Sequence, residues 1–181
     1  MLLFWEHGYE ATSLNDLTAT LGVPPSSIYS AFGDKKGLFF DAVGLYLSGP
    51  VTLEAMLAQA PTARAAAEAM LTGSAIGFTG ADTPAGCLLA SAALSCSENA
   101  ADVRQTLGAI RQGMEAQLRD RIIIGVEQRE LPPDTDADAL AGLTMAVVQG
   151  MSTLARDGAP REKLLRVAAG ALRAWPQPAS D

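Results

Sequence analysis

Hydrophobic residues recur every three or four positions along almost the whole chain, and the strict alternation typical of half-buried strands is absent. Alanine, leucine, arginine and glutamate are abundant, and runs of β-branched residues are short. These patterns predict an all-α fold. Glycine and proline divide it into short helices in the first third and five or six longer helices in the remainder.

Capping signals define the first two helices of the first third. Ser13, followed three residues later by Asp16, resembles a capping box and predicts a helix running to about Leu21. Gly22 ends that helix, and Pro25 suits the first turn of the next because its φ angle is already helical. The sequence therefore predicts two short helices joined by a sharp turn.

A longer helix follows, opened by Asp34 and running to about Leu47. Ser-Gly-Pro then interrupts the helical pattern, and we place a domain boundary there. We expect a small domain in residues 1–49 and a larger helical domain in residues 50–181.

The two short helices have the pattern of a helix-turn-helix, in which the second helix enters the major groove by its amino-terminal end. The positions expected to point inward are Leu14, Leu17, Leu21, Val23 and Ile28. The second helix would expose Ser26, Ser27 and Ser30, with Tyr29 at its flank. Hydroxyl groups can donate to or accept from any base edge, so they suit groove contact but discriminate weakly. Lys35 and Lys36 open the following helix, whose amino terminus is itself an anion site.

The segment "GYEATSLNDLTATLGVPPSSIYSAFGDKKGLFFDAVGLYL" resembles the DNA-binding domain of the TetR family of bacterial transcriptional regulators. The positions that match the family pattern, in order, are Gly8, Tyr9, Thr12, Ser13, Gly22, Ile28, Tyr29, Phe32, Lys35 and Leu38. The resemblance implies that phosphates are contacted by Thr12, Ser13, Tyr29 and Lys35. It also implies that the bases are faced by Pro25, Ser26, Ser27 and Ser30.

Charge opposes this function. The net charge is −7, and residues 1–49 hold five acidic side chains against two lysines, a net of −3. Because phosphate neutralisation supplies most non-specific affinity for DNA, we expect weak binding by this chain alone. The first helix of the family usually begins earlier, often behind a basic stretch. We therefore expect helix 1 to be truncated here, and the native protein to be longer or its start codon misassigned.

The resemblance implies that residues 50–181 form a ligand-binding and dimerising domain, and "GCLLASAAL" and "LLRVAAGALRAW" look like one widespread branch of such domains. Apolar stripes on the last two helices predict a four-helix interface about a two-fold axis. The expected interface residues are Leu140, Leu143, Val147, Met151 and Leu154 on one helix and Leu165, Ala168, Leu172 and Trp175 on the other. Packing of these stripes within one chain is the alternative.

Candidate effector-binding residues are mostly apolar. They are Met56, Met70, Phe78, Ile110 and Met114, which could line a cavity for a hydrophobic small molecule, although ordinary core packing explains the same pattern. Cys87 follows a loop and stands near a helix amino terminus, where a thiolate is stabilised, so it could sense oxidants or electrophiles. A small buried hydrophobic residue is the alternative for Cys87 and more so for Cys96. The two cysteines are expected to be reduced thiols.

Other function classes find no support in the sequence. It has one histidine, no phosphate-cradling glycine loop, no nucleophile elbow and no Cys/His metal spacing, so we expect neither enzyme activity nor a cofactor. No apolar run is long enough to span a membrane and no secretory signal opens the chain, which predicts a cytoplasmic protein. The favoured function is a ligand-responsive regulator that binds double-stranded operator DNA as a homodimer. The resemblance implies a repressor, since repression is the commoner behaviour in the family. The alternative is a helical small-molecule-binding or interaction protein that has lost DNA binding with its truncated first helix.

Overall fold

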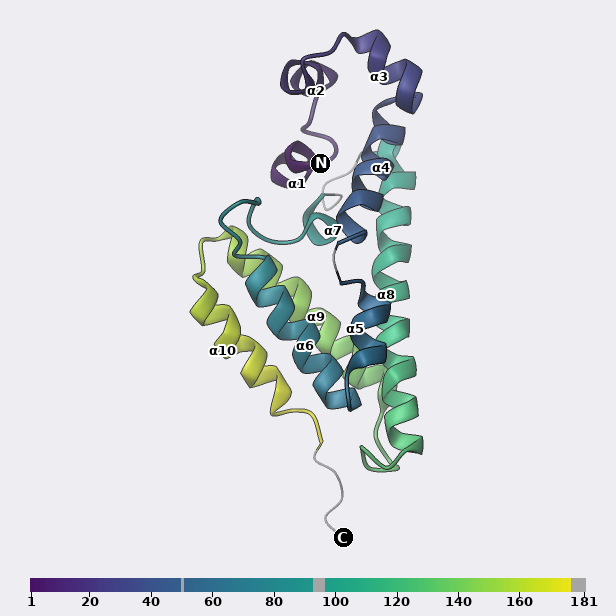
Figure 1. Ribbon diagram of the computed structural model, residues 1–181, viewed down its shortest axis with the longest axis vertical. Helices are drawn as coiled ribbons and strands as arrows, with labels where there is room; N and C mark the ends of the chain where they lie inside the picture. The colour runs from purple at the N-terminus through teal and green to yellow at the C-terminus, as the bar shows by residue number, and fades with distance from the viewer. Residues whose placement is uncertain (50, 93–96, 177–181) are drawn as a thin grey trace. The chain divides into compact units, whose positions relative to one another are not determined.

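The computed structural model describes residues 1–49, 51–92 and 97–176 (Figure 1). Within these ranges the chain forms ten α-helices and one 3-10 turn, with no strand, which confirms the predicted all-α fold. No helix among the described residues is both long and apolar enough to cross a lipid bilayer. Cys96, which the sequence predicts to be buried, lies outside the described residues.

The chain divides into two compact units. The first combines residues 1–50 with residues 87–109, and the second combines residues 51–86 with residues 110–181. The first unit is therefore discontinuous in sequence, and it holds a segment that a division at residue 49 assigns to the larger domain. The reason is local packing, because α7 contacts both α1 and α4.

The described part of the first unit contains six helical segments, most of them short, and one 3-10 turn. They are α1 (Leu2–His7), α2 (Leu14–Leu21), α3 (Pro25–Phe32), α4 (Lys35–Leu47), α7 (Leu88–Ser91), the 3-10 turn (Glu98–Ala100) and the first part of α8 (Ala101–Glu127). Its core is aromatic: the ring of Phe39 meets Phe4 edge-on at 5.1 Å between centroids, and Trp5 meets Tyr46 edge-on at 4.9 Å. Such edge-to-face pairs add to the free energy gained by burying the rings. They attach α4 to α1.

The second unit contains α5 (Leu53–Gln59), α6 (Ala63–Gly77), the remainder of α8, α9 (Ala137–Arg156) and α10 (Arg161–Leu172). The helices α6, α9 and α10 pack against one another, and α5 packs on α6 (Figure 1). The buried face of α6 includes Ala63, Ala66 and Ala67, all fully buried. Small side chains at these positions let the neighbouring helices approach closely.

A nearly buried ion pair lies near the end of α8 in the second unit. Arg121 and Glu130 form two parallel N–H···O bonds of 3.1 and 3.0 Å, and their side chains are 11% and 12% exposed. The same carboxylate accepts the backbone N–H of Ala63 at 2.6 Å, at the start of α6. A Cβ at Gly125 would lie 2.8 Å from the Cβ of Ala63, so glycine permits this close approach. The ion pair thus links α8, the loop after it and α6.

Two predictions of burial need correction. Leu21 is 52% exposed, because it is the last residue of α2 and the left-handed Gly22 turns the chain away after it. The residues expected at the dimer interface are only partly available to a second copy. Five of them are buried in the core of their own unit, namely Leu140, Met151, Ala168, Leu172 and Trp175. The indole N–H of Trp175 donates to the hydroxyl of Thr144 at 3.3 Å, which ties the chain after α10 to α9.

Candidate nucleic-acid interface

The turn between α2 and α3 is fixed by local hydrogen bonds and backbone geometry. The hydroxyl of Ser13 accepts the N–H of Asp16 at 3.1 Å, and the Asp16 carboxylate accepts the N–H of Ser13 at 2.9 Å, which confirms the predicted capping box. Gly22 adopts φ 67° and ψ 28°, the left-handed conformation that glycine adopts without strain. Pro25 is the first residue of α3, as predicted. The helix-turn-helix therefore forms where the sequence predicts it.

The outer face of α3 is polar and exposed. Ile28 is 1% exposed and anchors the helix to the unit, whereas Tyr29 beside it is 50% exposed. The other exposed side chains of this face are Pro25, Ser26, Ser27 and Ser30. All five residues assigned to base or phosphate contact on α3 therefore reach solvent. Their contact with DNA itself stays a prediction.

Thr12 does not fit its predicted role. Its side chain is fully buried, and its hydroxyl donates to the carbonyl of Gly8 at 2.7 Å, which joins the two ends of the turn between α1 and α2. A phosphate contact through this hydroxyl is therefore wrong. The neighbouring Ser13 is exposed at the amino terminus of α2, where a phosphate would meet the positive end of the helix dipole.

The two lysines at the start of α4 have different surroundings. The Lys36 ammonium lies 2.6 Å from a carboxylate oxygen of Asp102 on α8, and this hydrogen bond is the main cause that raises the pKa of Lys36. The Lys35 ammonium lies 4.5 Å from the centre of the Tyr9 ring and 3.4 Å from the carbonyl oxygen of Glu10. A DNA phosphate must displace the Asp102 carboxylate to reach the Lys36 ammonium. The Lys35 ammonium lies over the Tyr9 ring and near the Glu10 carbonyl, and its charge also acts on the Glu10 carboxylate.

Three acidic side chains near the helix-turn-helix accept backbone N–H groups. Asp16 caps α2, and Asp34 accepts the N–H of Gly37 at 2.7 Å at the start of α4. Glu10 accepts both the hydroxyl and the N–H of Ser97, at 2.7 and 3.1 Å, and the hydroxyl bond is the main cause that lowers the pKa of Glu10. These three residues are among the five acidic side chains of residues 1–49, and each has a structural role as a hydrogen-bond acceptor.

Gly37 is a position that sequence reasoning missed. A Cβ at this residue would lie 2.0 Å from the carbonyl oxygen of Phe32, the last residue of α3. No real Cβ contact is that short, so only glycine lets α4 begin so close to the end of α3. A glycine inside a predicted helical run was the available signal.

The expected effector residues are divided between the two units. Cys87 belongs to the first unit, and the other five, Met56, Met70, Phe78, Ile110 and Met114, belong to the second. Met70 and Phe78 are buried, while the remaining four are partly exposed. Cys87 is a thiol that accepts a hydrogen bond from the hydroxyl of Tyr46 at 3.3 Å. Burial is the main cause that raises the pKa of this tyrosine, followed by the charge of Cys87.

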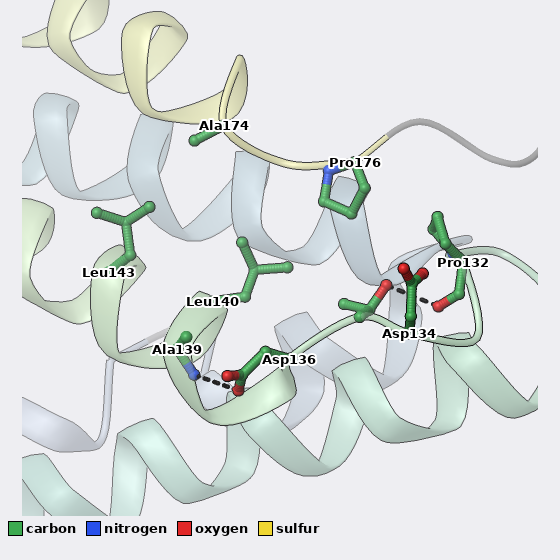
Figure 2. A pocket seen from close by; sticks show the side chains of 9 residues that line it. Pro132, Asp134, Asp136, Ala139, Leu140, Leu143, Ala174 and Pro176 are labelled. Atoms are coloured by element: carbon green, nitrogen blue, oxygen red, sulfur yellow. Dashed lines mark hydrogen bonds between the residues drawn. The ribbon is translucent and has the colours of Figure 1, made fainter.

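A hollow of about 380 Å³ opens in the second unit at the start of α9 (Figure 2). Figure 2 shows Leu140 and Leu143 on α9, Pro176 in the segment after α10, and Asp134 and Asp136 in the segment that leads into α9. The remaining lining residues are Pro132, Thr135, Ala139 and Ala174. A second hollow of about 220 Å³ is lined by Gln112, Glu115, Ala116, Arg119 and Asp138. Neither hollow is lined by a predicted effector residue.

Part of the predicted dimer surface is exposed. Leu143 is 42% exposed on α9 and Leu165 is 36% exposed on α10, and Val147 and Leu154 are half-buried on α9. Ala146 and Gly150 are exposed on the same helix as Leu143. The face that α9 and α10 leave uncovered is thus narrower than the predicted stripe, because its inner half fills the core of the unit.

Comparison with known proteins agrees with this geometry. Residues 1–42 match the family described as "Bacterial regulatory proteins, tetR family", and residues 55–169 match "Tetracyclin repressor-like, C-terminal domain". The HTH-type transcriptional repressor ComR of Escherichia coli (strain K12) is 35% identical over 179 residues, which cover 98% of this chain and 85% of ComR.

Solved structures agree as well. A cysteine-substituted form of the TetR family transcriptional regulator CifR, complexed with 26-bp double-strand operator DNA, superposes with a TM-score of 0.92 at 38% identity, covering 97% of this chain and 92% of CifR. A TetR transcriptional regulator from Chloroflexus aurantiacus J-10-FL, at 21% identity, has the same fold with a TM-score of 0.82 over 98% of this chain and 92% of its own. With the helix-turn-helix of α2 and α3, these matches show that the chain belongs to the tetR family of bacterial regulatory proteins and is a DNA-binding transcriptional regulator.

Proposed function

We propose that the protein is a ligand-responsive repressor that binds a two-fold operator as a dimer through α3. The exposed hydroxyl face of α3, fixed in place by the buried Ile28, is the observation that carries this proposal. ComR is named a repressor, and the CifR structure contains operator DNA, which supports the same role for this chain. Such a role places the protein beside the chromosome, in the cytoplasm.

On DNA, Ser26, Ser27 and Ser30 contact base edges from the first two turns of α3, with Pro25 against the same groove. Tyr29 and Lys35 contact phosphates on either side of that groove, and Ser13 contacts one at the amino terminus of α2. Lys36 contributes once a phosphate displaces Asp102 from its ammonium. Because two lysines supply the basic side chains of residues 1–49, we expect a shallow dependence of affinity on salt.

Dimerisation through α9 and α10 gives the protein two DNA-binding heads, namely the helix-turn-helix of α2 and α3 from each copy. Leu143 and Leu165 are the exposed apolar centres of the uncovered face, and the small Ala146 and Gly150 allow a second helix to approach. A two-fold axis through this face brings the same residues of both copies together.

The effector is a hydrophobic small molecule held among the apolar side chains of the second unit. Met56, Met70, Phe78, Ile110 and Met114 remain the candidates for its contacts, and methionine adapts to varied ligand shapes. Binding releases DNA only if the effector favours a conformation in which the two heads no longer match the operator spacing. A thiol-reactive signal would act at Cys87, where a substituent on sulfur would displace the hydroxyl of Tyr46.

Anisotropy titration of labelled duplexes across a salt series tests the DNA-binding proposal. The duplexes carry the sequence flanking the gene for this chain, with a scrambled duplex of equal length as the control. We expect saturable binding of the flanking duplex that weakens as salt rises. Ser27→Glu, which adds a negative charge to the groove face, should abolish it, whereas Gln117→Ala on the exposed side of α8 should leave it unchanged.

A second candidate function is a helical small-molecule-binding protein that no longer binds DNA. The net charge of −3 over residues 1–49 and the carboxylate on Lys36 favour it. Absence of measurable binding to either duplex at every salt concentration would support this alternative and contradict the repressor.

A further inference from the structure

Tyr9 is held rigidly on one side of its ring. Its backbone N–H donates to the carbonyl of Ala92 at 2.9 Å. Its ring meets Phe39 edge-on at 5.1 Å between centroids and stacks near Phe4 at 6.4 Å. Gly8, at φ 83°, leads into this position, and a Cβ on it would lie 3.4 Å from the carbonyl oxygen of Ala92, so the two segments are closely packed. The position of the aromatic ring is therefore set by the core of the first unit.

Lys35 lies over the same ring. Its ammonium is 4.5 Å from the ring centre, well within the roughly 6 Å range of a cation–π interaction. The carbonyl of Glu10, at 3.4 Å, supports it from the turn that leads into α2. We propose that Tyr9 is a positioning residue for DNA binding: its ring holds the Lys35 ammonium where a DNA phosphate is bound. This inference rests on the proposed operator-binding function.

The chemistry of the two lysines explains why a ring is the better support. Asp102 neutralises the charge of Lys36, so a phosphate gains little until that pair opens. The Tyr9 ring orients the Lys35 ammonium without itself carrying a compensating negative charge. Burial, followed by the charge of Asp34, raises the pKa of Tyr9, so the phenol stays neutral at physiological pH.

Fixing a lysine in advance also lowers the cost of binding. A free lysine side chain loses rotamer freedom when it contacts a phosphate, and this loss reduces the affinity. Tyr9 removes part of that cost before DNA arrives. The expected contribution is about two- to five-fold in affinity for each recognition helix, and about four- to twenty-five-fold for a dimer that uses two.

The placement is tested first without DNA. In the full-length chain the methylene protons of Lys35 next to nitrogen should be shifted upfield by the ring, and this shift should disappear in Tyr9→Leu and persist in Tyr9→Phe. An unshifted Lys35 signal in the wild-type chain would overturn the proposed geometry, whatever the protein does on DNA.

The role in binding is tested with rings of equal shape and falling π-electron density. Phenylalanine, difluorophenylalanine and trifluorophenylalanine are placed at position 9, and urea unfolding checks that stability is maintained. Operator affinity should fall along the series in the Lys35 chain and in a Lys36→Gln background, and should stay constant in a Lys35→Gln background. An equal fall in the Lys35→Gln background, or constant affinity in all three, would overturn the inference while wild-type operator binding stands. Absence of specific binding by the wild-type chain would overturn the repressor proposal and this role with it, even with the Lys35 shift observed.

Discussion

Removal of the Glu130 carboxylate should destabilise the second unit markedly. In Glu130→Ala, the guanidinium of Arg121 keeps its charge in a site that is only 11% exposed, and the N–H of Ala63 loses its acceptor. Breaking a buried ion pair by removing one partner typically costs about 3–5 kcal/mol, because the other charge stays desolvated. The slight exposure of this pair places the expected loss at the lower end, about 3 kcal/mol of unfolding free energy.

Urea unfolding at pH 7 measures this loss, and the two tryptophans allow the units to be followed separately. Trp5 lies in the first unit and Trp175, buried in the second, so fluorescence in a Trp5→Phe background reports on the second unit. Glu127→Ala is the matched control, because it removes an exposed carboxylate from the same end of α8. We expect the control to stay within about 0.5 kcal/mol of its parent.

The pH dependence provides an independent check. Burial alone would raise the pKa of Glu130, but hydrogen bonds from Arg121 and from the Ala63 N–H, with the charge of Arg121, lower it overall from the ordinary 4.5. A group whose pKa is lowered by folding contributes its full stabilisation above its unfolded pKa and loses it as the pH falls through the folded value. The difference in stability between wild type and Glu130→Gln should therefore be constant near neutral pH and shrink below about pH 4.5.

The reasoning fails if Glu130→Ala costs no more than Glu127→Ala, or if the difference from Glu130→Gln does not change under acid conditions. A double variant, Arg121→Met with Glu130→Gln, separates charge from packing. It removes both charges and keeps an acceptor for the Ala63 N–H. Its stability should lie closer to wild type than that of Glu130→Ala.

Three further predictions concern the first unit and the dimer. Gly37→Ala should weaken operator binding by roughly ten-fold or more in anisotropy titrations and lower the urea midpoint of the first unit. The reason is that the new methyl group would lie 2.0 Å from the Phe32 carbonyl oxygen. Gly44→Ala is the control and should have neither effect, because a Cβ at Gly44 has open space around it. Thr12→Val should lower the unfolding free energy by about 1–2 kcal/mol in urea, because the Gly8 carbonyl loses its donor, and leave the operator affinity of the folded protein unchanged. A loss of affinity under conditions in which the variant stays folded would restore Thr12 as a phosphate contact. Leu143→Glu should convert dimer to monomer in sedimentation and reduce operator affinity, whereas Ile124→Glu, at a similarly exposed position on α8, should preserve the dimer. A monomeric wild type would contradict the proposed interface.

The helices and their ends could be predicted from the sequence because their signals are local. Ser13 and Asp16 cap α2 across three residues, Gly22 supplies the left-handed turn, and Pro25 opens α3 with a backbone angle that it already has. The exposed face of α3 could be predicted in the same way, because a buried Ile28 determines which side of a short helix faces solvent.

Burial by distant elements could not be predicted in the same way. An apolar stripe on α9 has the same periodicity whether it faces its own chain or a second copy, so Met151 and Leu143 look alike in sequence, although the first is fully buried and the second 42% exposed. Thr12 likewise fits a surface hydroxyl and a buried one equally well. Its burial is decided by the carbonyl of Gly8 and by the packing around it. The ring of Tyr9 under Lys35 depends on a contact between residues far apart in the chain, which no local pattern encodes.

The return of residues 87–109 to the first unit limits how this regulator can be recombined with its relatives. A chimaera that transplants residues 1–49 onto another sensor would separate the N–H of Tyr9 from the carbonyl of Ala92, and the carboxylate of Glu10 from Ser97. A graft that carries both segments keeps these bonds within one parental sequence. Exchange of operator specificity between such proteins therefore requires more than a single crossover in the coding sequence, and tolerated natural recombinants should preserve the pairing of the two segments.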